Sequence, residues 1–263
     1  MNLGIKSKKE MTGIQNASIF KRLSAALLDI ILVAIIATGV MFGISAITNY
    51  DQYTEELESY YKEYETKYGF SLDMSEDDYN KMSEEEKKEF QEAYNDFFQK
   101  EKVLYLYNMT TNLILVMVTL GALFGILIVE FIIPLILKDG QTIGMKCFGI
   151  CLVKNNCVKV NGIVLFVRSI LGMFAVETMI PLYIMILIIF SSANIFMLIL
   201  LVGIILLNII VFLFTSNKCL LHDVFAYTVV VDKSLQVIFE SEEELIQYKK
   251  EVHANKVQKN TNY

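Results

Sequence analysis

Four ionisable residues lie inside or near the ends of long apolar runs, where a charge needs a partner: Asp29, Glu130, Arg168 and Glu177. A charged side chain at the centre of a membrane-spanning helix costs about 2.5–3.5 kcal/mol on insertion scales. Each of these residues therefore requires an ion partner, a proton or water. Carboxylates in such places form ion pathways, proton relays or pairs between helices. We therefore take Asp29, Glu130, Glu177 and Arg168 as a candidate cation or proton site.

Asp29 follows Arg22 by seven residues within one apolar stretch. That spacing brings the two side chains onto one helix face but separates them by about 10.5 Å along the helix axis. Helical side chains lean toward the helix N-terminus, so Arg22 is expected to extend to the interface and away from Asp29. We therefore predict that Asp29 contacts another element, with Arg168 as its best candidate partner.

The only two prolines each follow a glutamate by four residues, as Glu130 and Pro134 and as Glu177 and Pro181. Proline removes the hydrogen bond to the carbonyl four residues earlier, which here belongs to the glutamate. Each kink would place a carboxyl group beside a free carbonyl, an arrangement that favours a cation or proton site. Two ordinary kinks with protonated or hydrogen-bonded carboxyl groups would explain the same spacing, and this alternative stays open.

Little in the sequence supports catalysis or a metal centre. His222 and His253 are the only histidines, and a metal site at His222–Asp223 would need more ligands than the sequence offers nearby. The four cysteines match no familiar zinc spacing and, in a cytoplasmic location, are expected to stay reduced: Cys147, Cys151, Cys157 and Cys219. We predict no enzyme activity, no metal centre and no cofactor.

The elements that position these residues are membrane spans. The chain is 54% hydrophobic, with a mean hydropathy of +0.47, which is typical of a membrane protein. Segments of about 20 apolar residues can cross a bilayer, and four regions meet this length: 24–47, 110–137, 164–190 and 193–215. The last two are joined by a few residues around Ser191, Ser192 and Ala193, which predicts a tight hairpin. The expected fold is all-α transmembrane, a four-helix membrane bundle whose main partner is the lipid bilayer.

Basic residues set the expected orientation. The N-terminal tail (1–23) contains Lys6, Lys8, Lys9, Lys21 and Arg22, and residues 138–168 contain Lys138, Lys146, Lys154, Lys159 and Arg168. Residues 51–102, within the segment 48–109, hold seven lysines and seventeen acidic residues, a net charge of −10. We therefore predict a multi-pass cell-membrane protein. The acidic insert 48–109 is outside; the N-terminal tail, the loop 138–163 and the C-terminal segment 216–263 are cytoplasmic. The overall net charge of −6 argues against nucleic acid as a partner.

The insert has the pattern of a helical hairpin. Aromatic and leucine residues recur every three or four positions, as Tyr53, Leu57, Tyr61, Tyr64 and Tyr68. Ser83 followed by Glu86 is a capping-box start that leads to Phe90, Tyr94 and Phe97. The tyrosines would form the hairpin's own small core. The alternative is an ectodomain that binds a partner or a cation.

Three sequence stretches together resemble the RDD family of membrane proteins: KRLSAALLDIILV, KDGQTIGMKCFGICLVKN and LLHDVFAYTVVVD. The arginine and two aspartates that name this family correspond to Arg22, Asp29 and Asp223. Its Gly-Gln-Thr-x-Gly element corresponds to Gly140, Gln141, Thr142 and Gly144, with Gly149 as the later glycine. Tyr227 stands where the family more often has glycine, and Glu130 and Glu177 belong to no family motif. The resemblance implies a membrane protein, and a transport role that includes cation/proton exchange has been proposed for some members.

These motifs also have a direct structural interpretation. Gly140, Gln141 and Thr142 can turn the chain and cap a short interfacial helix over 142–148. Gly149 permits a turn into the β-prone stretch 150–153, and 158–160 and 227–231 have the same character. Three short strands would form a small cytoplasmic β element. It would bring Asp223 near the entry of the first span, to cap backbone N–H groups or pair with Arg22.

Two functions fit this pattern. The first is a transporter-like protein that moves or senses a small cation or proton, as a homo-oligomer because four helices enclose little space. The alternative is a membrane scaffold or interaction protein, in which the charges lock helices together and the insert recruits a partner.

Overall fold

The computed structural model describes residues 13–137, 139–190 and 195–261. Several residues used above lie outside these ranges, namely Lys6, Lys8, Lys9, Lys138 and the expected turn at Ser191, Ser192 and Ala193.

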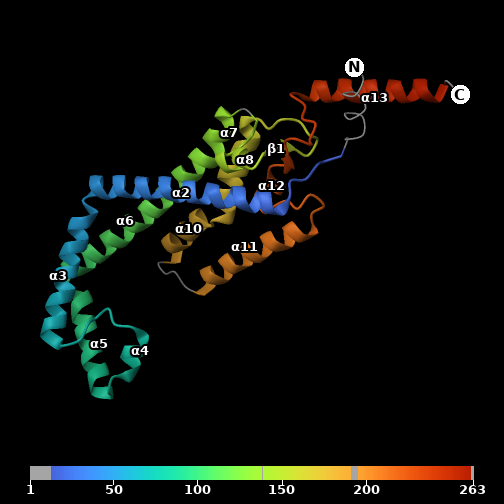
Figure 1. Ribbon diagram of the computed structural model, residues 1–263. Coiled ribbons are helices and arrows are strands. Elements are labelled where there is room, and N and C mark those ends of the chain that lie inside the picture. The colour runs from blue at the N-terminus through green and yellow to red at the C-terminus, as the bar shows by residue number, and fades with distance from the viewer. Residues whose placement is uncertain (1–12, 138, 191–194, 262–263) are drawn as a thin grey trace. The chain divides into compact units, whose positions relative to one another are not determined.

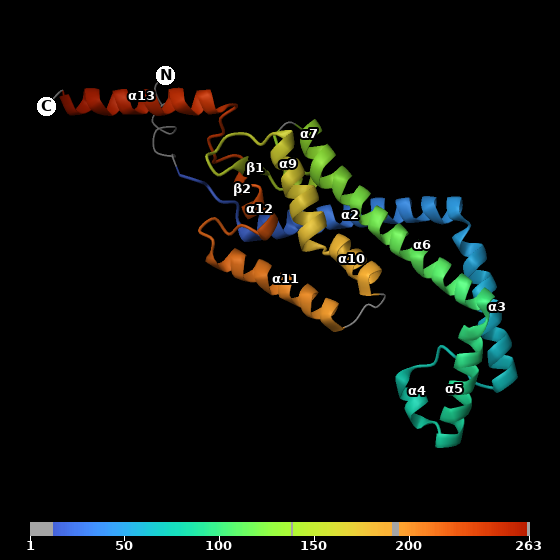
Figure 2. The same cartoon turned by 180° about the vertical axis from the view of Figure 1, so that it is seen from behind.

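The described chain is mostly helical (Figures 1 and 2). Its α-helices are α2 (Ile19–Thr48), α3 (Tyr50–Tyr68), α4 (Glu76–Lys81), α5 (Glu84–Gln99), α6 (Glu101–Ile126), α7 (Ile133–Ile136), α8 (Ile143–Cys147), α9 (Gly162–Phe166), α10 (Ile180–Phe190), α11 (Ile195–Phe214), α12 (Leu221–Phe225) and α13 (Glu242–Thr261). Two π-helices, η1 (Leu127–Ile132) and η2 (Val167–Glu177), and two strands, β1 (Ile150–Lys154) and β2 (Thr228–Asp232), complete it. The predicted helical class with a small β element is thus confirmed.

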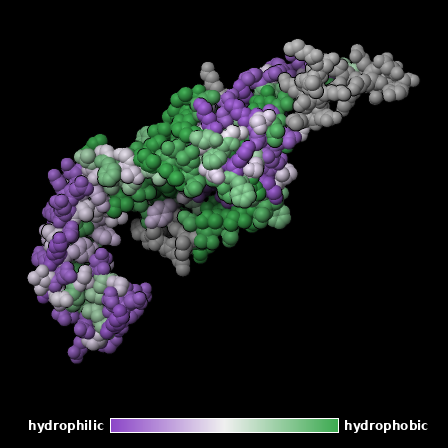
Figure 3. Space-filling model, in the orientation of Figure 1, coloured by the Kyte–Doolittle hydropathy of each residue, from purple (hydrophilic) through white to green (hydrophobic). Residues whose placement is uncertain are grey.

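The chain divides into two compact units. Residues Met1–Ala37 and Ala122–Tyr263 form one, the site unit, and Thr38–Gly121 form the other, the insert unit. In Figure 3, hydrophobic residues gather over the apolar helices of the site unit, beside some hydrophilic ones, whereas hydrophilic residues predominate on the insert unit around α3, α4 and α5. The surfaces of the two units are therefore suited to different surroundings, apolar for the site unit and aqueous for α3, α4 and α5.

Two helical stretches are long and apolar enough to cross a membrane, Ile19–Thr48 and Glu101–Ile136. A third candidate exists if the bent pair Gly162–Glu177 and Ile180–Leu187 is one span, and Ile199–Phe214 is a shorter apolar helix. These stretches overlap the four predicted spans. The first two spans therefore have direct structural support, while the four-span bundle stays a prediction.

The insert unit has the expected helical hairpin. The hydroxyl of Ser83 accepts the N–H of Glu86, and the Glu86 carboxylate accepts the N–H of Ser83, so the predicted capping box opens α5. Tyr64, fully buried, stacks against Tyr68 and meets Phe97 edge-on. The buried core comprises Leu57, Tyr64, Leu72, Ala93, Phe97, Val103 and Leu106. The prediction that the tyrosines form the insert's own core is confirmed.

Glu130 and Glu177 both belong to π-helices, in η1 and η2 respectively. The N–H after η1, that of Ile133, donates to Ile128, and the N–H after η2, that of Thr178, donates five residues back as well. π-helices are rare and occur frequently at functional sites. The wider turn changes which residues share a face, so a period of 3.6 residues does not describe these two segments.

Pro134 and Pro181 each lie in the first turn of the α-helix that follows a π-helix, where a missing N–H is tolerated. Before α10, Met179 has a φ of 54°, and the helix axis bends by 44°. The kink predicted at Pro181 is therefore confirmed, just before that proline. Pro134 lies within a helical stretch that continues from Glu101 to Ile136, so the kink predicted there is not found.

The small sheet is antiparallel, with Ile150 opposite Asp232 and Lys154 opposite Thr228. Two of the three predicted strands are confirmed with ends shifted by one residue: 150–153 corresponds to β1 and 227–231 to β2. The stretch 158–160 forms only isolated bridges, with Val158 to Phe239 and Lys159 to Val153. It is too short to form a strand, because Asn161 caps α9 directly after it.

Candidate functional site

The Gly-Gln-Thr-x-Gly segment forms a tight turn that leads into α8. Gly140 has a φ of 60°, and a Cβ there would lie 3.0 Å from the carbonyl oxygen of Leu152, so glycine is required on both counts. The Gln141 amide donates to the carbonyl of Ile150 at 2.6 Å. The hydroxyl of Thr142 then accepts the N–H of Met145 and caps α8, as predicted.

Asp29 from α2 accepts hydrogen bonds from this turn. Its carboxylate accepts a hydrogen bond from the Thr142 hydroxyl at 2.5 Å and another from the Gly144 N–H at 2.8 Å. A Cβ at Gly144 would collide with the carbonyl of Ala25 and with this carboxylate, so only glycine lets α8 approach α2 so closely. The predicted Asp29–Arg168 pair is therefore wrong. Neutral donors of the neighbouring motif satisfy Asp29, and Arg168 is committed elsewhere.

Arg168 is the centre of the site and is 4% exposed. Its Nε donates to Asp223 Oδ1 at 2.9 Å, and its Nη1 donates to Glu130 Oε2 at 2.8 Å. Its Nη2 lies 3.1 Å from Nε2 of His222. A guanidinium carries donors in a fixed planar fork, so one side chain joins η1, η2 and α12.

His222 links this hub to Glu177. Its Nδ1 lies 2.9 Å from both carboxylate oxygens of Glu177, and its backbone N–H donates to Glu177 Oε1 at 3.1 Å. Gly172 makes this approach possible, since a Cβ there would lie 2.7 Å from the Cβ of His222. The end of η2 and the start of α12 are therefore held together at two points.

Asp223 receives a second cation from α2. Arg22 Nη2 lies 3.6 Å from Asp223 Oδ2, which agrees with the interfacial role predicted for Arg22. Burial raises the pKa of the Asp223 carboxyl, but the neighbouring His222, Arg168 and Arg22 together outweigh burial and hold this pKa below its usual range. Asp223 is therefore ionised at neutral pH, as an acceptor for both guanidinium groups.

Asn208 positions α12 from α11. Its Oδ1 accepts the N–H of Leu221 at 3.0 Å, which satisfies a free donor at the start of the helix that carries His222 and Asp223. Asn208 was not predicted from the sequence, and His222 was considered only as a metal ligand, a role that the sequence did not support. The signal for Asn208 was an amide within a run of otherwise apolar residues. The signal for His222 was its position beside a motif aspartate.

The ionisable side chains of this site line one cavity of about 270 Å³ in the site unit. Four carboxyl groups line it, those of Asp29, Glu130, Glu177 and Asp223, together with both arginines of the chain, Arg22 and Arg168, and with His222. With every carboxyl ionised and His222 neutral, the lining would carry two surplus negative charges. Among the described residues, no group of three or more His, Cys, Asp and Glu side chains is arranged to hold a metal ion.

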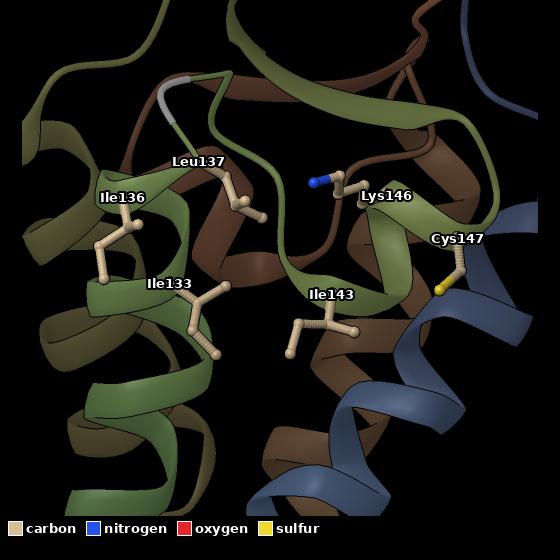
Figure 4. A pocket seen from close by; sticks show the side chains of 6 residues that line it. All are labelled: Ile133, Ile136, Leu137, Ile143, Lys146 and Cys147. Atoms are coloured by element: carbon tan, nitrogen blue, oxygen red, sulfur yellow. The ribbon is translucent and has the colours of Figure 1, made fainter.

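A second hollow of about 550 Å³ lies between α7 and α8 and has a different character (Figure 4). It is lined by Ile133, Ile136, Leu137, Ile143, Lys146 and Cys147. Figure 4 shows that these side chains come from the last turns of one helix and from the short helix opposite. It contains no carboxyl group, so the acid–base chemistry of the site unit belongs to the charged cavity.

The chain was compared with protein families, curated proteins and solved structures. Residues 16–227 match the model of the RDD family, a range that includes Arg22, Asp29, the Gly140–Gly144 turn and Asp223. Neither the curated proteins nor the solved structures gave a match. The family match spans well over half of the chain and contains the residues that meet at the charged cavity, so the chain belongs to the RDD family.

Proposed function

We propose that this protein is a multi-pass membrane protein whose charged cavity binds a small cation or proton and moves it or senses it. Asp29, Glu130, Glu177 and Arg168, which the sequence nominated, all line that cavity. Membership of the RDD family and the long apolar helices support a membrane location. The transport role is our inference from the charges.

The observation that carries the proposal is the excess of acid around the cavity. Four carboxyl groups face two guanidinium groups, and three of these carboxyl groups are 7% exposed or less: Asp29, Glu130 and Asp223. Surplus negative charge in a poorly hydrated place must be compensated by protons or by cations from solution. A cavity with this surplus of negative charge is suited to bind and release protons or cations.

The proposed orientation follows from the basic residues and not from the fold. Both termini and the turn at Gly140–Gly144 would be cytoplasmic, and the acidic insert 48–109 would lie outside a cell membrane. The third and fourth spans would be the bent pair of η2 with α10, and α11. Engineered glycosylation or cysteine labelling of the insert and the C-terminal segment tests this topology.

The test of function is a flux assay with purified protein in lipid vesicles, across a panel of monovalent cations and protons. We expect Glu130→Gln and Glu177→Gln to reduce flux at least tenfold, with folded protein recovered in both cases. Lys250→Gln on the exposed face of α13 is the matched control and should leave flux unchanged. Unchanged flux in both glutamate variants would contradict the proposal.

A second candidate function has its own supporting observation. Among the described residues, every buried side-chain nitrogen and oxygen has a hydrogen-bond partner, as expected for a purely structural lock between helices. The protein would then be a scaffold whose insert recruits a partner. Asp29→Asn separates the two candidates. Stable protein without flux supports a functional carboxylate, whereas degraded protein supports the lock.

We also propose a homo-oligomer without catalytic activity, because a single copy has few spans around its cavity. Chemical crosslinking in the native membrane should give discrete species larger than one chain. Monomers alone would contradict this part of the proposal.

A further inference from the structure

The hydrogen bonds of His222 assign its protonation state. Arg168 has only donors, so Nε2 of His222 must accept the hydrogen bond from Arg168 Nη2 at 3.1 Å. The single ring proton of the neutral imidazole is then on Nδ1, where it is donated to Glu177 at 2.9 Å. His222 in this geometry is neutral, with its remaining lone pair in use.

A second proton can bind only at Nε2, in the position that Arg168 occupies. An N–H bond would form from the lone pair that now accepts the Arg168 hydrogen bond, and that hydrogen bond would break. The proton comes from hydronium in the surrounding water, where an O–H bond breaks as the N–H bond forms, and no electron is transferred. An acceptor for the new N–H is already present, because Asp223 Oδ1 lies 3.5 Å from Nε2.

We propose that His222 is a proton-binding site in the charged cavity, at which a proton and the guanidinium of Arg168 exclude each other. The inference rests on the proposed function and names the proton as the ion that the cavity binds. In the neutral state Arg168 joins Asp223, Glu130 and His222. In the protonated state Arg168 keeps the two carboxylates, and His222 turns from acceptor to donor.

The charged groups around His222 explain why both states are accessible. They are Arg168 and Glu177 from η2, Asp223 from α12, Glu130 from η1, and Arg22 and Asp29 from α2. The neighbouring contacts from α11 and β2 are neutral, through Asn208 and Thr228. The surplus of carboxyl groups favours an imidazolium ion, whereas the direct contact with Arg168 opposes it. Movement of one guanidinium group therefore decides whether the proton is held.

The composition of the chain permits a direct spectroscopic test. It contains two histidines, so His253→Gln on the exposed face of α13 leaves His222 as the only histidine signal. We would record ¹⁵N spectra of this variant in lipid bilayers from about pH 8 to about pH 5, the range in which histidine titrates. The expected result is the Nδ1–H tautomer at high pH and protonation of both nitrogens on acidification. The Nε2–H tautomer at high pH, or no titration, would overturn the proposal.

The arginine signals provide the second half of the test. Arg22 and Arg168 are the only arginines of the sequence, so their side-chain ¹⁵N resonances can be told apart with Arg22→Lys. The Arg168 signals should shift with the same midpoint as the His222 ring. Arg168 signals that stay constant while His222 titrates would overturn the exchange.

A flux arm separates failure of this inference from failure of the proposed function. If the native protein transports, His222→Gln should lose the pH dependence of flux while His253→Gln keeps it. An unchanged pH profile in His222→Gln would overturn the role of His222 and leave transport intact. If the native protein moves no ion, the transport role fails, and the spectra of otherwise native protein still decide whether His222 binds the proton.

Discussion

Asp29 is satisfied by a hydroxyl and a peptide N–H, although it lies in an apolar helix. The same Thr142 oxygen that donates to Asp29 also accepts the N–H of Met145. One threonine therefore does two things, since it starts α8 and joins α8 to α2. In this chain the Gln-Thr-x-Gly element therefore binds Asp29, the first aspartate of the motif.

Thr142→Val should destabilise the protein by about 2–4 kcal/mol. It removes a helix cap, about 1 kcal/mol, and leaves a buried carboxylate without one donor, about 1.5–3 kcal/mol. Thermal unfolding in detergent measures the effect. Thr110→Val is the control, because the Thr110 hydroxyl bonds only within its own helix. Equal stabilities of the two variants would contradict a stabilising hydrogen bond between Thr142 and Asp29.

Asp232 provides a pH-dependent contribution at the end of β2. The ion pair with Lys21 Nζ at 2.6 Å and the hydroxyl of Ser234 lower the pKa of Asp232 to about 2. Because the folded pKa is below the unfolded value, the stabilisation is present at neutral pH and is lost progressively as pH falls from about 5 to about 1, through the folded pKa. Asp232→Asn should cost about 1–2 kcal/mol at pH 7 and nothing at about pH 1. Unfolding midpoints of both proteins across this range should converge at the acid end.

At this scale the sequence predicted which residues matter better than how they pair. Asp29, Glu130, Arg168 and Glu177 were recognisable because charges are costly in apolar runs. Their partners were not, because η1 and η2 place side chains on different faces from those of a regular helix. The role of His222 was not predictable either, because its partner Glu177 in η2 lies 45 residues earlier in the chain.

The element that completes the site is α12, which has only five residues and must be held from outside. Asn208 satisfies its first N–H, η2 packs against it at Gly172, and β2 follows directly. The short helices and turns at the glycines were predictable from capping and φ requirements. The dependence of α12 on α11 and η2 was not, because it arises from tertiary contacts.

Gly172→Ala should separate η2 from α12. The new Cβ would lie 2.7 Å from the Cβ and 2.9 Å from the Cα of His222, so backbone must shift, at a cost of about 1–3 kcal/mol. Gly203→Ala in α11 is the control, because nothing lies within 4 Å of its new Cβ. We expect the control to be neutral or slightly stabilising. Thermal unfolding and the His222 titration should both change in Gly172→Ala alone.

At the scale of the whole molecule, the insert unit has a core of its own, separate from the charged cavity. Its sequence predicted this outcome well, because a capping box and an aromatic period of three to four residues are local signals. The membrane class was predictable from the apolar runs, whereas the count of four spans stays a prediction. Bends and π-helices shorten the regular segments below the length of a single apolar run.

Phe97→Ala should unfold the insert unit and leave the charged cavity intact. Phe97 is fully buried, and its truncation should cost about 3–5 kcal/mol. Hydrogen exchange should increase in peptides from 50–106 and stay constant in peptides around Arg168 and Asp223. Tyr105→Ala, at a residue that is 51% exposed, is the control with a small expected effect. Faster exchange around Arg168 in Phe97→Ala would contradict the independence of the two units.

The position of α12 in the chain has a consequence for biosynthesis. Arg168 is made before its partners His222 and Asp223, which follow it by 54 and 55 residues. Until α12 emerges from the ribosome, Arg168 has its ion pair with Glu130 but lacks the one with Asp223, and Asp29 depends on the Gly140–Gly144 turn. A nascent chain that ends before residue 220 should therefore keep an incompletely paired arginine and be a substrate for membrane quality control. Synthesis of the last sixth of the chain is therefore the step that completes the ion pairs of the earlier helices.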